Sequence, residues 1–144
     1  MNSQQIIKTK NIKIDELKFN SVTKNLIFQD QQKNPEVDKM REIIRHWYEN
    51  KIKTDGFDGS LEVKVKIIEI NKVKQVDYFK ITIDLTIEFN EIPDNLISNK
   101  TYNVSITEFG EILGSFSIND QENLTLNIMH QSLKSITQKI LELN

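Results

Sequence analysis

The sequence contains two histidines, His46 and His130, and imidazole is the side chain that most readily performs acid–base chemistry or binds a metal near neutral pH. The spacing of the apolar residues around them predicts that they lie on two different helices, where they could in principle meet. A zinc site needs three or four ligands, often with local spacing such as two histidines four residues apart. That spacing is absent here, so we interpret both histidines as surface or boundary residues.

Two acidic groups are the next candidates. The run Asp55-Gly56-Phe57-Asp58-Gly59 has the bend of a calcium loop, but such loops place ligands at alternate positions and end in a bidentate Glu. Lys66 stands where that Glu is needed, so we interpret the run as the end of a helix that leads into a strand.

Asp84 and Glu88 share the polar face of one strand with Lys80, and the Thr and Lys residues between them are typical of an ordinary solvated face.

Composition excludes further classes of chemistry. The sequence has no cysteine, which excludes disulfides and thiolate metal sites, and only four glycines, too few for phosphate-cradling loops. No nucleophile elbow or dinucleotide fingerprint is present. The net charge of −2, with signs that alternate along each element, argues against a nucleic-acid partner. No segment reaches the roughly 18 consecutive apolar residues of a transmembrane helix. We predict no catalytic residues, metal or cofactor.

At 144 residues the chain has the length of one domain, and we predict a flexible segment over residues 1–10 followed by a single α+β domain over 11–144. The predicted order is β-α-β-β-β-α, an antiparallel sheet with two amphipathic helices packed on one face. We expect one or two strands in 11–28, with a break near Asn20-Ser21, and then a helix from Asn34-Pro35 to before Gly56 with Ile52 on its apolar stripe. A strand with Leu61, Val63, Val65 and Ile67 on one side follows, then a turn at Asn71–Gln75 and a strand over Val76–Phe89. The last elements are a strand from Tyr102, with a bulge or bend at Gly110 and Gly114, and a helix from Asn119-Asp120.

The Val76–Phe89 strand has the clearest pattern. Every second residue from Phe79 to Phe89 is apolar and the residues between them are polar, so one face belongs to the core and the other meets water. We predict that this strand is central and that the helices carrying Trp47 and Leu133 cover its apolar face. Trp47 is interpreted as a core residue, with an exposed anchor in a groove between helix and sheet as the alternative.

The run from Trp47 to Gly59, followed by the strand Leu61–Ile70, resembles an uncharacterised family of alphaproteobacterial lipoproteins. In that family a helix ends in a Trp, followed by a basic-apolar pair, two glycines three residues apart and a strand. The central strand and the last helix follow in the same order, so the resemblance covers most of residues 11–143. The architecture is also similar to the lipopolysaccharide-assembly lipoprotein and to auxiliary lipoproteins of envelope lipid transporters. The chain departs from them in lacking a lipobox cysteine and a signal peptide.

The resemblance implies a non-enzymatic periplasmic domain, tethered to a membrane through a leader absent from this chain, that binds a protein partner or an envelope lipid. No functional residues can be carried over. On the uncovered sheet face we expect Tyr78, Thr82, Thr86 and Tyr102 to form the binding surface. One alternative is a small cytoplasmic α+β ligand-binding or enzyme domain with a pocket between sheet and helices. The other is a subunit of a larger complex that uses the heptad-like stripe of the last helix; the oligomeric state is not predicted.

Overall fold

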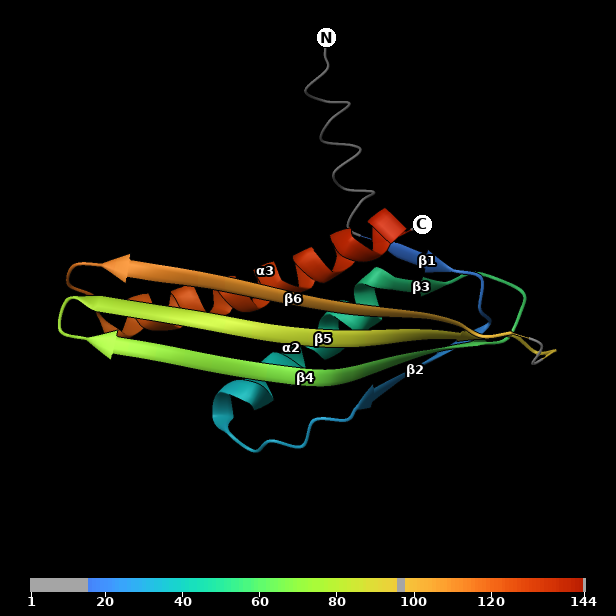
Figure 1. Ribbon diagram of the computed structural model, residues 1–144, viewed down its shortest axis with the longest axis horizontal. Coiled ribbons are helices and arrows are strands. Elements are labelled where there is room, and N and C mark those ends of the chain that lie inside the picture. The colour runs from blue at the N-terminus through green and yellow to red at the C-terminus, as the bar shows by residue number, and fades with distance from the viewer. Residues whose placement is uncertain (1–15, 96–97, 144) are drawn as a thin grey trace, which may run out of the picture.

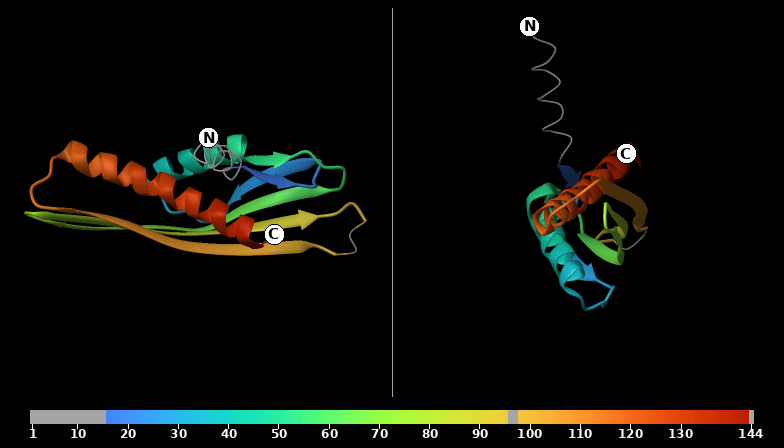
Figure 2. Two further views of the ribbon diagram at one scale, coloured as in Figure 1. Left: turned by 90° about the horizontal axis from the view of Figure 1, so that it is seen from above. Right: turned by 90° about the vertical axis from the view of Figure 1, so that its left-hand side faces the viewer.

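The computed structural model describes residues 16–95 and 98–143. The predicted flexible segment 1–10, and residues 11–15 of the first predicted strand region, lie outside this range. The described chain is a mixed α+β structure, as predicted, with a long sheet on one side and two helices on the other (Figure 1, Figure 2). No helix in the described part of the chain is long and apolar enough to cross a membrane.

The main sheet has the strand order β2-β4-β5-β6. Its strands are β2 (Thr23–Phe28), β4 (Ser60–Gln75), β5 (Tyr78–Ile92) and β6 (Lys100–Leu113). β4, β5 and β6 are antiparallel, but β2 runs parallel to β4, so the predicted all-antiparallel sheet is wrong at this edge. The short strands β1 (Leu17–Phe19) and β3 (Ile52–Thr54) form a separate parallel pair. The break between β1 and β2 falls at Asn20-Ser21, as predicted.

The two helices begin at caps encoded in the sequence. Helix α2 (Pro35–Lys51) starts with proline at its first position, and the Asn34 side chain accepts a hydrogen bond from the Val37 N–H at 2.9 Å. Helix α3 (Ile118–Leu143) starts after Ser117, whose hydroxyl accepts from the Asp120 N–H while the Asp120 carboxylate accepts from the Ser117 N–H. Ile52 does not extend the α2 stripe; it is fully buried in β3, opposite Leu17.

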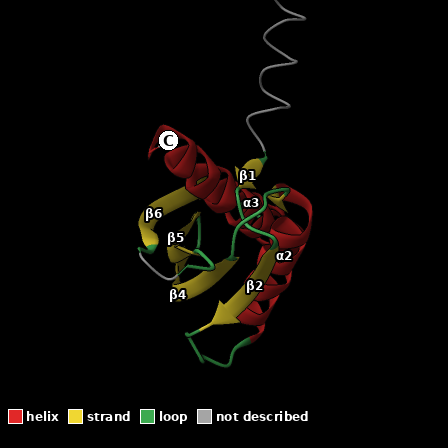
Figure 3. Ribbon diagram, turned by 90° about the vertical axis from the view of Figure 1, so that its right-hand side faces the viewer, coloured by secondary structure: helices red, strands yellow, loops and turns green. Residues whose placement is uncertain are grey.

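The core lies between the helices and one face of the sheet, and the four strands curve around the helices (Figure 3). Every second residue of β5 from Phe79 to Phe89 is fully buried, which confirms the predicted core face and the interior position of this strand. Trp47 is also a core residue, as predicted: it meets the Phe89 ring edge-on at 6.2 Å and donates a hydrogen bond to Thr137 Oγ1 at 2.9 Å. Leu133 is buried on α3.

A β-bulge at Lys66 changes which side chains of β4 enter the core. Val65 pairs with Ile87 but Ile67 pairs with Thr86, so one residue of β4 has no partner across the ladder. The bulge reverses the alternation beyond it: Ile68 is fully buried, and Ile67, predicted to share the core face with Val65, lies on the opposite face and is 45% exposed.

Two predicted breaks in the strands are wrong. The segment Asn71–Gln75 is not a turn, because β4 continues to Gln75 and pairs there with Tyr78, leaving only Val76 and Asp77 in the hairpin loop. The register of β6 passes through Gly110 without a bulge. Gly110 instead lies beneath α3, where a Cβ atom would come within 2.8 Å of the Leu124 side chain.

Candidate binding surface

The uncovered face of the main sheet, here called the open face, carries three of the four predicted binding residues. Tyr78, Thr82 and Thr86 of β5 alternate with the buried residues and so lie on this face, partly exposed. Tyr102 does not: it pairs across the strands with buried Phe89 and packs against the core. Directly opposed residues share one side of a sheet, so Tyr102 is half-buried on the helix side and is removed from the predicted surface.

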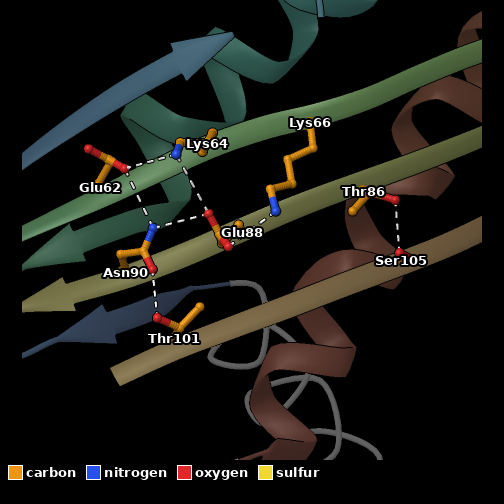
Figure 4. A network of polar contacts seen from close by, with 8 residues as sticks. All are labelled: Glu62, Lys64, Lys66, Thr86, Glu88, Asn90, Thr101 and Ser105. Atoms are coloured by element: carbon orange, nitrogen blue, oxygen red, sulfur yellow. Dashed lines mark hydrogen bonds and ion pairs between the residues drawn. The ribbon is translucent and has the colours of Figure 1, made fainter. Parts of the chain in front are cut away.

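One half of the open face is a network of paired charges and hydrogen bonds (Figure 4). The Glu88 carboxylate lies 3.2 Å from the Lys66 ammonium and 3.8 Å from that of Lys64. Asn90 donates to Glu88 at 3.3 Å and accepts from the Thr101 hydroxyl at 2.7 Å. Glu62 completes the network through Lys64, and Thr86 and Ser105 share a hydrogen bond beside it. The polar groups of this half therefore satisfy one another.

Glu88 is the electrostatic centre of this network. Burial opposes ionisation of its carboxyl group, but the hydrogen bonds from Asn90 and Lys66 and the charges of Lys66 and Lys64 outweigh burial and hold the pKa of Glu88 below its ordinary value. A carboxyl group whose pKa is lower in the folded state stabilises the fold above its ordinary pKa. This stabilisation is lost as the pH falls through the lower, folded-state pKa.

We expect Glu88→Gln to lower the free energy of unfolding at pH 7 by roughly 0.5–1 kcal/mol, the size of a networked surface pair. The difference between the two proteins should shrink as the pH falls below the ordinary glutamate value of 4.5, and it should vanish below the lower, folded-state pKa of Glu88, where this side chain is neutral in both states. Urea unfolding measured from pH 7 to pH 3 tests this. Glu122→Gln, at an exposed position of α3 that forms no ion pair with a described residue, is the matched control and should show no such convergence. A difference that persists at pH 3 would contradict the electrostatic role of Glu88.

The opposite half of the open face carries exposed apolar side chains. It ends at the β4–β5 turn, beside the end of β6 and the start of α3, and we call this the distal end (left in Figure 1). Here the structure exposes five large apolar side chains, defined as the distal patch: Val73 (47% exposed), Val76 (90%), Phe109 (57%), Leu113 (79%) and Ile118 (72%). They come from β4, β6 and α3 and from the turn between β4 and β5.

Polar neighbours of the distal patch are held in place by one another. The Tyr78 hydroxyl donates to a Glu111 carboxylate oxygen at 2.7 Å, and this hydrogen bond, with burial and the Glu111 charge, raises the pKa of Tyr78. The Lys80 ammonium lies 4.8 Å from the centre of the Phe109 ring. Asp84 accepts a hydrogen bond from Thr107. The predicted acid–base candidates Asp84, Glu88 and Lys80 thus each have a partner.

A groove of about 490 Å³ opens beside the distal patch, between β4 and the two helices. Its apolar lining includes Leu126, Met129 and Ile118, the last of which is also part of the distal patch. Lys39, Lys72 and Lys74 line it as well, and Lys72 pairs with Glu36 of α2. The groove is continuous with the exposed apolar end of the molecule through Ile118.

The remaining candidates from the sequence are the loop Asp55–Gly59 and the two histidines. The loop Asp55–Gly59 is structural: Asp58 accepts from the Asp94 N–H, and Gly59 has a positive φ of 73°. Among the described residues, no group of three or more His, Asp or Glu side chains could hold a metal ion. His46 and His130 do come together, however, as two of the residues that line a groove between α2 and α3.

No protein-family model matches the sequence, and no curated protein matches it. Solved structures do resemble the fold. The rare lipoprotein B from Shewanella oneidensis is 13% identical, with a TM-score of 0.41 over 83% of this chain and 91% of that one. A minor lipoprotein from Acinetobacter baumannii is 12% identical, with a TM-score of 0.41 over 81% of this chain and 86% of that one. Similarity at this level assigns neither a family nor an activity.

Sequence reasoning missed the distal patch. Phe109 and Leu113 alternate with residues that face the core, which a phase count from Val104 and Ile106 could have shown. Val73 could not be placed in the same way, because the bulge at Lys66 reverses the alternation of β4 before it. The adjacent pair Ile67-Ile68, which breaks the alternation, is the signal that a bulge lay there.

Proposed function

We propose that this protein is a non-enzymatic binding domain of the bacterial envelope that holds a protein partner against the distal end of its open face. The observation that carries the proposal is the gathering of five exposed apolar side chains at the distal end. Scattered apolar residues are normal on a protein surface, whereas a cluster beside a groove marks an interaction site.

The chemistry of the open face supports binding without catalysis. Three of its carboxylates are engaged: Glu88 with two lysines, Glu111 with Tyr78 and Asp84 with Thr107. A general acid or base must be within hydrogen-bond reach of the substrate and able to exchange a proton with it. Tyr78 and Thr82 pair across the strands with Leu113 and Phe109 of the distal patch, and Thr86 lies beside the polar network. We propose that these three side chains contribute polar contacts at the rim. The envelope location and the membrane tether rest on the family resemblance, and cell fractionation tests them.

Site-specific photocrosslinking in the native cells tests the proposed surface. A photoreactive amino acid at Phe109 or Leu113 is expected to give a crosslink to one protein of defined mass. The matched control positions are Thr101 and Asn103, which lie on the same face of the same strand at the other end, and which should give none. A crosslinked product that contains lipid instead of protein would show that this surface binds lipid and would contradict a protein partner. Equal crosslinking from both ends would contradict the proposal.

Leu113→Glu is the corresponding variant. Because this side chain is 79% exposed, the free energy of unfolding should change by no more than about 0.5 kcal/mol. Recovery of the crosslinked partner from Phe109 should fall at least tenfold, because a charge would be desolvated in an apolar interface. Thr101→Glu introduces the same charge at the polar end and should leave the recovery unchanged.

A further inference from the structure

The groove between α2 and α3 has a buried apolar floor and an exposed cationic rim. It has a volume of about 320 Å³, and Ile43, Trp47 and Leu133, all nearly buried, form its floor. The rim carries His46, Asn50 and Lys51 from α2 and His130 and Lys134 from α3. Two helices far apart in the sequence therefore each contribute one histidine and one lysine to the same opening.

The polar group of the floor is already satisfied. The Thr137 hydroxyl accepts from Trp47 Nε1 at 2.9 Å and donates to the Leu133 carbonyl at 2.8 Å. This pairing fixes the indole ring in the floor and joins the two helices. The floor therefore offers a ligand only apolar contact, and the polar groups of a ligand would interact with the side chains of the rim.

The basic side chains of the rim are not paired with acidic side chains. Within residues 16–95 and 98–143, no acidic side chain lines the groove. Lys51, Lys134 and the two imidazoles make no hydrogen bond or ion pair with any described residue, whereas most charges on the open face are paired. The two unpaired ammonium groups at this opening attract negative charge and can bind a phosphate group as point charges. The two imidazoles beside them can donate hydrogen bonds to it.

We propose that this groove is a binding site for a ligand that carries a phosphate group. The phosphate lies between Lys51 and Lys134, within reach of the histidine side chains, and the less polar part of the ligand rests on Trp47 and Leu133. A doubly charged phosphate suits four basic groups better than a single carboxylate does. The source of the phosphate is either a soluble phosphomonoester or the headgroup of a lipid. The groove lies on the helical side of the molecule, away from the open face, so this site is independent of the proposed partner surface.

Trp47 is the single tryptophan of the chain and so reports on its own groove. Titration with inorganic phosphate, glycerol 3-phosphate and a short-chain phosphatidic acid, at constant ionic strength, is expected to change the Trp47 emission saturably and to raise the midpoint of thermal unfolding. Glycerol is the uncharged control. Binding of the soluble ester as tightly as the lipid supports the site with the phosphomonoester as the source. Binding of the lipid alone supports it with a headgroup as the source.

The double variant Lys51→Gln/Lys134→Gln should raise the Kd at least tenfold. His46→Gln/His130→Gln should raise it less, because it keeps both lysines. The matched control is Lys33→Gln/Lys100→Gln, which removes the same charge from exposed positions outside the groove and should leave the Kd within twofold. The proposal is overturned if millimolar phosphate and both esters change neither the emission nor the unfolding midpoint. It is also overturned if the control pair weakens binding as much as the groove pair.

Discussion

Replacement of Phe89 by alanine is expected to lower the free energy of unfolding by about 3–5 kcal/mol, the largest effect of any single truncation in this core. Phe89 is fully buried and contacts three parts of the fold that are distant in sequence. Its ring stacks on Phe19 of β1 at 5.8 Å and meets the edge of Trp47 of α2 at 6.2 Å. Its backbone lies between Val63 of β4 and Tyr102 of β6.

The effect is large because the surrounding structure cannot relax to fill the cavity that the substitution leaves. An alanine at position 89 leaves a cavity whose walls belong to β1, α2 and the sheet, and no one of these elements can move in without loss of its other contacts. Urea unfolding followed by circular dichroism measures the loss, and Trp47 fluorescence should shift to longer wavelength as water reaches the ring. Phe109→Ala removes the same atoms from the open face and should change stability by less than about 1 kcal/mol. A loss below about 2 kcal/mol for Phe89→Ala would contradict the central role of this contact.

The parts of the fold that the sequence predicts are those in which local chemistry and global packing agree. The alternation from Phe79 to Phe89 is unbroken because β5 is paired on both sides, so the pattern predicts both its buried face and its interior position. The start of α2 was predictable because Asn34 and Pro35 satisfy the helix end without help from the rest of the chain.

The errors arise where tertiary pairing overrides a local pattern. Ile52 has helical spacing from Ile44, yet it enters β3 because Leu17 offers a parallel strand partner. β2 is parallel to β4, a choice made by the crossover through α2 that no residue of β2 encodes. The Lys66 bulge moves Ile67 out of the core and so places Val73 on the distal end.

The candidate sites divide in the same way. The open face followed from the alternation of β5, but Tyr102 was wrongly assigned to it, since Tyr102 alternates in phase with the buried residues Val104 and Ile106 and pairs with Phe89. The two histidines were correctly placed on two helices. Their convergence on one groove depends on the crossing of α2 and α3, which is fixed by contacts such as the Trp47–Thr137 hydrogen bond, 90 residues apart in sequence.

The second large effect is expected at Gly59, in the loop that the sequence likened to a calcium site. Gly59 has a φ of 73°, and a Cβ atom there would lie 2.0 Å from the Ile92 carbonyl oxygen. A backbone atom cannot rotate away as a side chain can, so the loop or the end of β5 must shift. The Gly59 carbonyl also accepts the Val22 N–H at 2.9 Å, directly before β2 pairs with β4. A shift at Gly59 therefore loosens the entry of β2 into the sheet.

We expect Gly59→Ala to lower the free energy of unfolding by about 3 kcal/mol or more, as the left-handed conformation costs roughly 1–2 kcal/mol and the clash adds to it. Gly114→Ala separates the two causes, because Gly114 also has a positive φ, of 101°, but nothing lies within 4 Å of its missing Cβ. This control should lose only the conformational part. Amide hydrogen exchange should show faster exchange at Val22 in Gly59→Ala alone. Equal losses of stability in the two variants would mean that backbone conformation, and not the approach of Ile92, makes glycine necessary at position 59.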